Sequence, residues 1–134
     1  MGRKILALVV AWIVAVAIIM IGQMFMGAIW AAPSPTIRED PEAMRAYIEG
    51  LPTQAFVVLA IVYAVASFAG GFIVTKMSRR EMPGMTFPLI IGTLLLIGGI
   101  LNFFVFVPYH PPWVTAACLL IFLPATLIGH RFAR

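Results

Sequence analysis

One uncharged run near the start of the chain decides the fold: ILALVVAWIVAVAIIMIGQMFMGAIWAA, residues Ile5–Ala32, in which Gln23 is the one strongly polar side chain. About 20 consecutive apolar residues cross the hydrocarbon core of a bilayer as a helix, so this run spans it with some tilt. Arg3 and Lys4 precede the run, as basic residues precede a signal peptide's apolar core, but that core has only about 7–15 residues. We therefore predict an uncleaved membrane-spanning helix.

Three more apolar runs follow, at about 52–77, 85–107 and 112–132, with a polar outer loop at 33–51. The chain is 63% hydrophobic and only 10% charged, whereas soluble domains carry about 25% charged residues. A soluble domain of 134 residues could not bury so much apolar surface, but a bilayer accepts it. The sequence predicts an all-α, integral membrane four-helix bundle that forms a single transmembrane domain over residues 1–134.

The loop between the first two spans contains its own helix signals. Asp40 is placed to cap a helix that starts at Pro41, with Glu42 near the positive end of the helix dipole and Gly50 at its end. The apolar residues of this segment recur at helical spacing: Met44, Tyr47, Ile48 and Leu51. We predict a short amphipathic helix at the membrane interface or over the mouth of the bundle. The alternative is a solvated, turn-rich loop.

Lysine and arginine collect on one side of the predicted membrane. Seven lie at the termini and in the 76–84 link, against two in the 33–51 loop: Arg3, Lys4, Lys76, Arg79, Arg80, Arg131 and Arg134 against Arg38 and Arg45. Cytoplasmic loops of membrane proteins carry this excess, so both termini are predicted to be cytoplasmic. The same placement explains the net charge of +4 as a topology signal, and we do not expect nucleic-acid binding.

The polar side chains within the spans are few and uncharged. No Asp, Glu, Lys or Arg lies in the interior of a span, which disfavours a proton-coupled transport mechanism within one subunit. Gln23, Asn102 and Thr115 lie at similar depth in the outer part of the bilayer, with Tyr109 and His110 just above. These five residues form a candidate outer polar cluster. For Gln23, Asn102 and Thr115 the alternative is structural hydrogen bonds between helices, worth about 1 kcal/mol each. For His110 the alternative is a solvated loop histidine.

Small residues at a spacing of four mark where helices can approach closely in lipid. The first span has Ala7, Ala11 and Ala15, and the second span has three further rows: Ala60 and Ala64, Ser67 and Gly71, and Ala66 and Gly70. In the third span Gly92 and Gly99 lie seven residues apart. These rows serve packing within one bundle, a homo-oligomer or a larger membrane complex, and the sequence does not separate these uses. Cys118 is the only cysteine, so no intrachain disulfide can form.

The order of several short motifs resembles a known group of proteins. The motifs are Asp40-Pro41-Glu42-Ala43, Leu51-Pro52, Ala69-Gly70-Gly71-Phe72, Gly98-Gly99-Ile100-Leu101-Asn102, Pro112-Trp113, Leu123-Pro124-Ala125 and Ile128-Gly129. Over most of its length the chain looks like an uncharacterised family of small bacterial four-helix inner-membrane proteins. The resemblance implies a fold and the bacterial inner (plasma) membrane, and no activity.

Three functional hypotheses follow from the sequence. The first is a non-enzymatic accessory, assembly or scaffold subunit, because the spans are uncharged and rich in small residues. The alternative is an oligomeric channel or carrier for a small neutral or apolar solute, lined by Gln23, Asn102 and Thr115. The third is a membrane enzyme or lipid-binding protein that uses His110. We expect no catalytic constellation, cofactor or metal, and the bilayer as the main partner.

Overall fold

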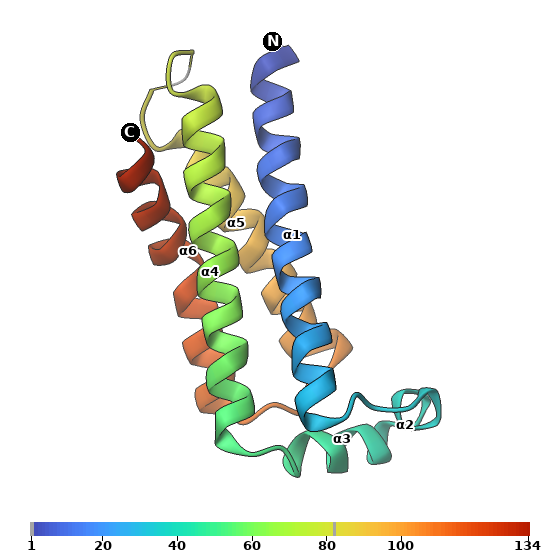
Figure 1. Cartoon of the computed structure of the whole chain (residues 1–134). Helices are drawn as coiled ribbons and strands as arrows, with labels where there is room; N and C mark the ends of the chain where they lie inside the picture. The colour runs from blue at the N-terminus through green and yellow to red at the C-terminus, as the bar shows by residue number, and fades with distance from the viewer. Residues whose placement is uncertain (1, 82) are drawn as a thin grey trace.

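The computed structural model describes residues 2–81 and 83–134. Four long helices form a bundle (Figure 1): α1 (Gly2–Trp30), α4 (Thr53–Ser78), α5 (Thr86–Leu101) and α6 (Pro112–Ala133). A short π-helix, η1 (Asn102–Phe106), continues α5, so the third span covers Thr86–Phe106. The described residues contain no strand. The prediction of an all-α four-helix bundle is confirmed, and each span begins and ends within three residues of the expected position.

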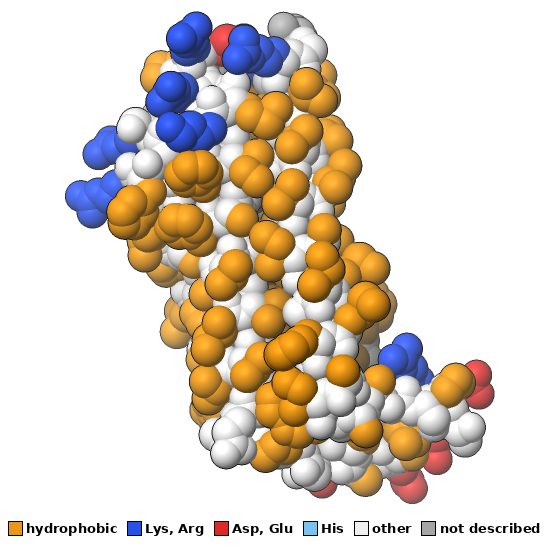
Figure 2. Space-filling model, viewed as in Figure 1, with side chains coloured by type: hydrophobic (Ala, Val, Ile, Leu, Met, Phe, Trp, Pro, Cys, Tyr) orange, Lys and Arg blue, Asp and Glu red, His pale blue; other side chains and the backbone are white. Residues whose placement is uncertain are grey.

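The two ends of the bundle differ in structure and in charge. Both termini and the link between α4 and α5 lie at one end, which we call the basic end, because the lysines and most arginines gather there (Figures 1 and 2). The short helices α2 (Pro35–Glu39) and α3 (Pro41–Glu49) lie across the other end, which we call the capped end. This separation of charge is the one that the sequence predicted for the two sides of a membrane.

Between these ends the surface of the bundle is apolar (Figure 2). Large side chains on different helices point outward, including Ile13, Ile97 and Leu120, which are 59%, 49% and 73% exposed. Contiguous exposure of this kind would be strongly unfavourable in water, whereas lipid accepts it at no cost. Each span is a helix, which satisfies its own backbone hydrogen bonds as a bilayer requires. The chain is therefore a multi-pass membrane protein.

Helix α4 is the centre of the bundle, because it packs against α1, α5 and α6. Its closest partner is α6, where two glycines let the backbones meet. A Cβ atom on Gly71 would overlap with the carbonyl group of Thr126, and one on Gly129 would overlap with the carbonyl group of Phe68. Such close approach maximises dispersion contacts in a solvent that supplies no hydrophobic drive between helices.

The small-residue row of α1 also lies at a helix contact. Ala7, Ala11 and Ala15 are fully buried, and they are the only buried residues of α1. Gly70 of α4 faces Ala15 on one side and Ile91 of α5 on the other. The contact between α1 and α5 is slight. Helix α1 thus packs on α4 through this alanine stripe and, nearer the capped end, through Gly22, which lies closely against Val62.

Buried polar groups at the basic end all have partners. Thr75 of α4 and the Nδ1 atom of His130 of α6 form a hydrogen bond of 2.9 Å. The buried hydroxyls of Ser67, Ser78 and Thr126 donate to backbone carbonyls one turn earlier in their own helices. A polar group left unpaired in this environment would be costly, so these bonds are a condition of the tight packing between α4 and α6.

The capped end contains one helix more than the sequence predicted. Asp40 caps α3 as expected, accepting a hydrogen bond from the Glu42 amide at 3.1 Å, and α3 ends at Gly50. The extra helix, α2, uses the same device six residues earlier, with Ser34 as its cap and proline at its first position. Ser34-Pro35 carries the same start signal as Asp40-Pro41, and it is the feature that the sequence analysis missed.

Replacing Gly71 by alanine should lower the free energy of unfolding by about 1–3 kcal/mol, because the new methyl group would overlap with the Thr126 carbonyl. Gly98→Ala is the matched control, since a Cβ atom there meets nothing within 4 Å. The measurement is SDS-induced unfolding in mixed micelles. Equal stability of the two variants would contradict the close α4–α6 packing.

Candidate functional site

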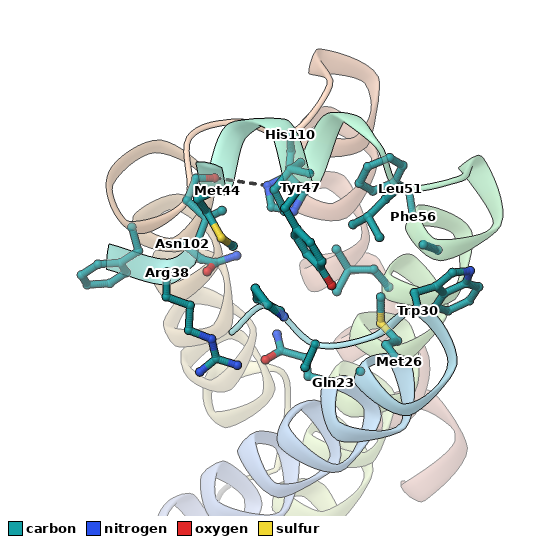
Figure 3. A pocket seen from close by; sticks show the side chains of 18 of the residues that line it. Gln23, Met26, Trp30, Arg38, Met44, Tyr47, Leu51, Phe56, Asn102 and His110 are labelled. Carbon is teal, nitrogen blue, oxygen red and sulfur yellow. Dashed lines mark hydrogen bonds between the residues drawn. The ribbon is translucent and has the colours of Figure 1, made fainter. Parts of the chain in front are cut away.

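A cavity of about 470 Å³ opens beneath α3 at the capped end (Figure 3). Its walls come from α1, α2, α3, α4, η1 and the loop after η1. The lining residues are Gln23, Met26, Gly27, Trp30, Ala32, Pro33, Arg38, Met44, Tyr47, Ile48, Leu51, Ala55, Phe56, Leu59, Tyr63, Asn102, Phe106, Val107 and His110. The lining is thus mostly apolar with a few polar groups, which is the usual make-up of a small-molecule site, and the volume falls in the usual range.

The apolar face of α3 forms the roof of this cavity. The four residues predicted to share a face, Met44, Tyr47, Ile48 and Leu51, all line it. The Tyr47 hydroxyl donates a 2.7 Å hydrogen bond to the carbonyl of Ala31, which ties α3 to the end of α1. Ala31 has a positive φ of 56°, an uncommon conformation for a residue with a side chain. Helix α3 therefore lies over the mouth of the bundle, one of the two expected positions.

Gln23 and Asn102 meet at this cavity from different helices. Gln23 comes from α1, and Asn102 is the first residue of η1. In η1 the Val107 amide bonds to the Asn102 carbonyl at 2.8 Å, five residues back. Such π-turns are rare and occur often at functional sites, and the sequence offered no signal for this one. Figure 3 shows both amide side chains extending toward the cavity.

His110 is packed among aromatic rings rather than solvated. Its ring meets Phe103 at a centroid distance of 4.8 Å and Phe56 at 5.9 Å, both edge to face. The Nδ1 atom donates to the carbonyl of Val107 at 3.2 Å, because a carbonyl can only accept. Burial lowers the pKa of His110 from its ordinary value of 6.5, and the Val107 carbonyl partly opposes this effect. His110 is thus a partly buried loop histidine whose ring contacts two phenylalanines.

The other two residues of the candidate polar cluster do not line the cavity. Thr115 is half-buried on α6, a helix that contributes nothing to the lining. Tyr109 packs against the hydrophobic core from the loop before α6. The structure thus brings Gln23, Asn102 and His110 to one cavity and leaves Thr115 and Tyr109 outside it. Whether the cluster binds a ligand stays a prediction.

Two lining residues have roles that the sequence did not suggest. The sequence analysis used Arg38 only as one of the two basic residues of the outer loop, and the structure places it in the lining of the cavity (Figure 3). Tyr63 is almost completely buried in α4, where its ring packs edge to face against Phe103. Burial raises the pKa of Tyr47 above its ordinary value, and the positive charge of Arg38 opposes that rise. Arg38 is therefore close enough to act on groups within the cavity.

A second, narrower space lies deeper in the bundle. This crevice of about 240 Å³ is bounded by α1 and α5, with Tyr63 and Phe122 behind it: its lining residues are Trp12, Val16, Ile19, Gln23, Tyr63, Leu95, Gly98, Gly99, Asn102 and Phe122. It exists because α1 and α5 hardly touch. Gln23, Tyr63 and Asn102 line both spaces, so the crevice adjoins the cavity at these three residues.

Comparison with known proteins does not assign a function to the cavity. No family model, curated protein or solved structure matches the chain. The cavity and the crevice are therefore the features that bear on function.

Lowering the pH from 7.5 to 5 should destabilise the capped end, and His110→Asn should reduce this dependence. Because burial depresses the pKa of His110 in the folded state, the unfolded state binds the proton more readily below pH 6.5. Stability is therefore lost as the pH falls through that window. The measurement is the thermal unfolding midpoint against pH. An unchanged pH dependence in His110→Asn would contradict the burial of this ring.

Proposed function

We propose that the protein is a non-enzymatic accessory protein of the bacterial inner membrane that binds one molecule taken from the membrane in its capped-end cavity. The observation that carries this proposal is the cavity itself, which lies on the membrane-facing side of α3 and adjoins a crevice between two spans. Its mostly apolar lining with two amides, an imidazole and a guanidinium suits a ligand that is largely apolar and has a polar part.

The choice of a binding protein over an enzyme is supported by the chemistry of the lining. The cavity residues include no carboxylate, thiol, serine or threonine. Apart from the phenols of Tyr47 and Tyr63, His110 is the one acid–base group among the lining residues, and its Nδ1 atom is used by the Val107 carbonyl. Nucleophilic catalysis needs a nucleophile beside a base, and binding needs only shape and hydrogen bonds.

An oligomeric carrier for a small neutral or apolar solute is the second candidate. The crevice favours it, because it leads from the cavity toward the middle of the bilayer. Below the crevice, however, the core of the bundle is filled by fully buried Ala15, Ala66 and Ile91. A solute that passed through one subunit would have to displace these side chains. Binding without transport requires no such rearrangement, and we therefore favour it.

The orientation follows from the charge on the two ends. We place the basic end in the cytoplasm and the capped end outside, because lysine and arginine favour the cytoplasmic side. The bacterial inner membrane itself is proposed from the resemblance to small bacterial membrane proteins.

Labelling of single cysteines in intact cells should report this orientation. In a Cys118→Ala background, Thr36→Cys in α2 should react with a membrane-impermeant maleimide, whereas Pro83→Cys should react only after the inner membrane is opened. Both positions are exposed in the structure, so accessibility within the fold does not limit either reaction. The reverse pattern would overturn the proposed topology.

Native mass spectrometry of the protein extracted in mild detergent should detect one bound molecule. The combined Gln23→Leu and Asn102→Leu variant should weaken binding about thirtyfold, because it removes two hydrogen bonds and each contributes roughly 1 kcal/mol within a membrane. Thr115→Val is the matched control, since Thr115 lies outside the lining.

Full occupancy in the double variant, or no bound molecule in the wild type, would overturn the proposed function. Solute flux through proteoliposomes that the same double variant abolishes would favour the carrier instead. A defined protein partner in a mild-detergent pull-down supports the accessory role, and a clean monomer without a partner counts against it.

A further inference from the structure

The cavity and the crevice differ in the chemistry of their walls. The crevice is apolar except where it adjoins the cavity, at Gln23, Tyr63 and Asn102. The cavity carries the polar groups, and its roof is the amphipathic helix α3. A molecule that filled both spaces would need an apolar part in the bilayer interior and a polar part near the membrane surface. This is the chemistry of an amphiphile.

The crevice opens sideways between two spans. Gly98 of α5 lines it and is exposed, and a Cβ atom there would meet nothing within 4 Å. Trp12 and Ile19 of α1 form the opposite wall. Because the outer surfaces of α1 and α5 face lipid, an acyl chain can pass between them without entering water.

The cavity contains one charged side chain, Arg38, and its charge is not compensated within the protein. No carboxylate of residues 2–81 and 83–134 lies within 4 Å of its guanidinium. The neighbouring Arg45, by contrast, pairs with Glu49 at 3.2 Å on the exposed side of α3. Arg38 is exposed at the edge of the cavity, and Gln23 and Asn102 line the same cavity, as Figure 3 shows. A guanidinium together with two neutral amides is well suited to a phosphate group.

We propose that the capped-end cavity and the α1–α5 crevice together bind a phospholipid with an anionic headgroup, drawn sideways from the bilayer. One acyl chain lies in the crevice against Trp12 and Gly98, and the phosphate lies at Arg38. Gln23 and Asn102 hydrogen-bond to the polar atoms between them. This inference rests on the proposed function and names its ligand class.

A lipid explains the site better than free phosphate does. Inorganic phosphate would use Arg38 and leave the crevice empty, whereas the crevice adjoins the polar residues directly. Burying the chain against the crevice walls is favourable relative to water, but it contributes nothing relative to lipid. Selectivity among membrane lipids must therefore come from the headgroup, which makes Arg38 the specificity-determining residue.

The test uses the full chain in nanodiscs that contain equal amounts of phosphatidylglycerol and phosphatidylethanolamine. Lipids that remain bound after gentle release are counted by native mass spectrometry. Arg38→Gln removes the cation, and Arg45→Gln is its control because Arg45 pairs outside the cavity. Gly98→Leu fills the crevice without a clash at its Cβ, and Ile97→Phe is its control because it adds bulk on the neighbouring lipid-facing position.

We expect the wild type to retain one phosphatidylglycerol in preference to phosphatidylethanolamine. Arg38→Gln should weaken retention of phosphatidylglycerol about tenfold or more, as expected for the loss of a charge-assisted hydrogen bond. It should weaken phosphatidylethanolamine less, because the ammonium group of that lipid already neutralises its phosphate, so the preference should fall as well. Gly98→Leu should reduce retention of both lipids, and both controls should behave as the wild type. Dodecyl phosphate should compete with the bound lipid, and inorganic phosphate should not.

Retention that is indifferent to Arg38→Gln, or equal for the two lipids, would overturn the anionic-lipid inference while leaving the proposed binding function intact. If inorganic phosphate competes as well as dodecyl phosphate does at the same concentration, the ligand is a soluble anion and not a lipid. If Gly98→Leu binds lipid as the wild type does, the crevice is not part of the site. If no molecule is bound, or if its binding does not depend on Gln23 and Asn102, the proposed function is overturned as well.

Discussion

The reciprocal contact between α4 and α6 fixes the spacing on which the rest of the bundle depends. Gly71 lies against the carbonyl of Thr126, and Gly129 lies against the carbonyl of Phe68, so the two backbones approach more closely than any side chain would allow. Helix α1 joins through the alanine stripe along α4, again with small residues. Toward the capped end the residues between helices are larger, with Phe56, Tyr63 and Phe103 in the core. Close packing of the basic half and bulky aromatic residues in the capped half together leave space beneath α3.

The sequence predicts the spans well because hydrophobic length and charge are local properties. The run Ile5–Ala32 and the basic residues around it identify a span without any knowledge of its neighbours. The cap at Asp40 and the apolar face of α3 are predictable for the same reason, since each depends on residues within one or two turns. The small-residue row Ala7, Ala11 and Ala15 also lies where its spacing placed it, at a buried helix contact.

The cavity was predicted only in part, because its shape depends on how helices meet. Depth along each span brought Gln23 and Asn102 to the same level, but rotation about the helix axis decides which side chains face each other. Thr115 has the right depth and lies on α6, which does not line the cavity. The π-turn at Asn102 and the presence of Arg38 in the cavity lining depend on tertiary packing, so neither has a local signal. The burial of His110 between Phe56 and Phe103 has the same origin.

The unequal lengths of α1 and the third span connect this site to the thickness of the membrane. Helix α1 has 29 residues and the third span has 21, which correspond to about 44 Å and about 31 Å. The hydrocarbon core is about 30 Å thick, so α1 tilts or extends into the headgroup layer while α5 with η1 matches the core closely. Because α1 meets α5 only slightly, a change in its tilt alters the width of the crevice between them. Hydrophobic mismatch in a thinner or thicker bilayer thus acts directly on the opening through which a molecule from the membrane would reach Gln23 and Asn102.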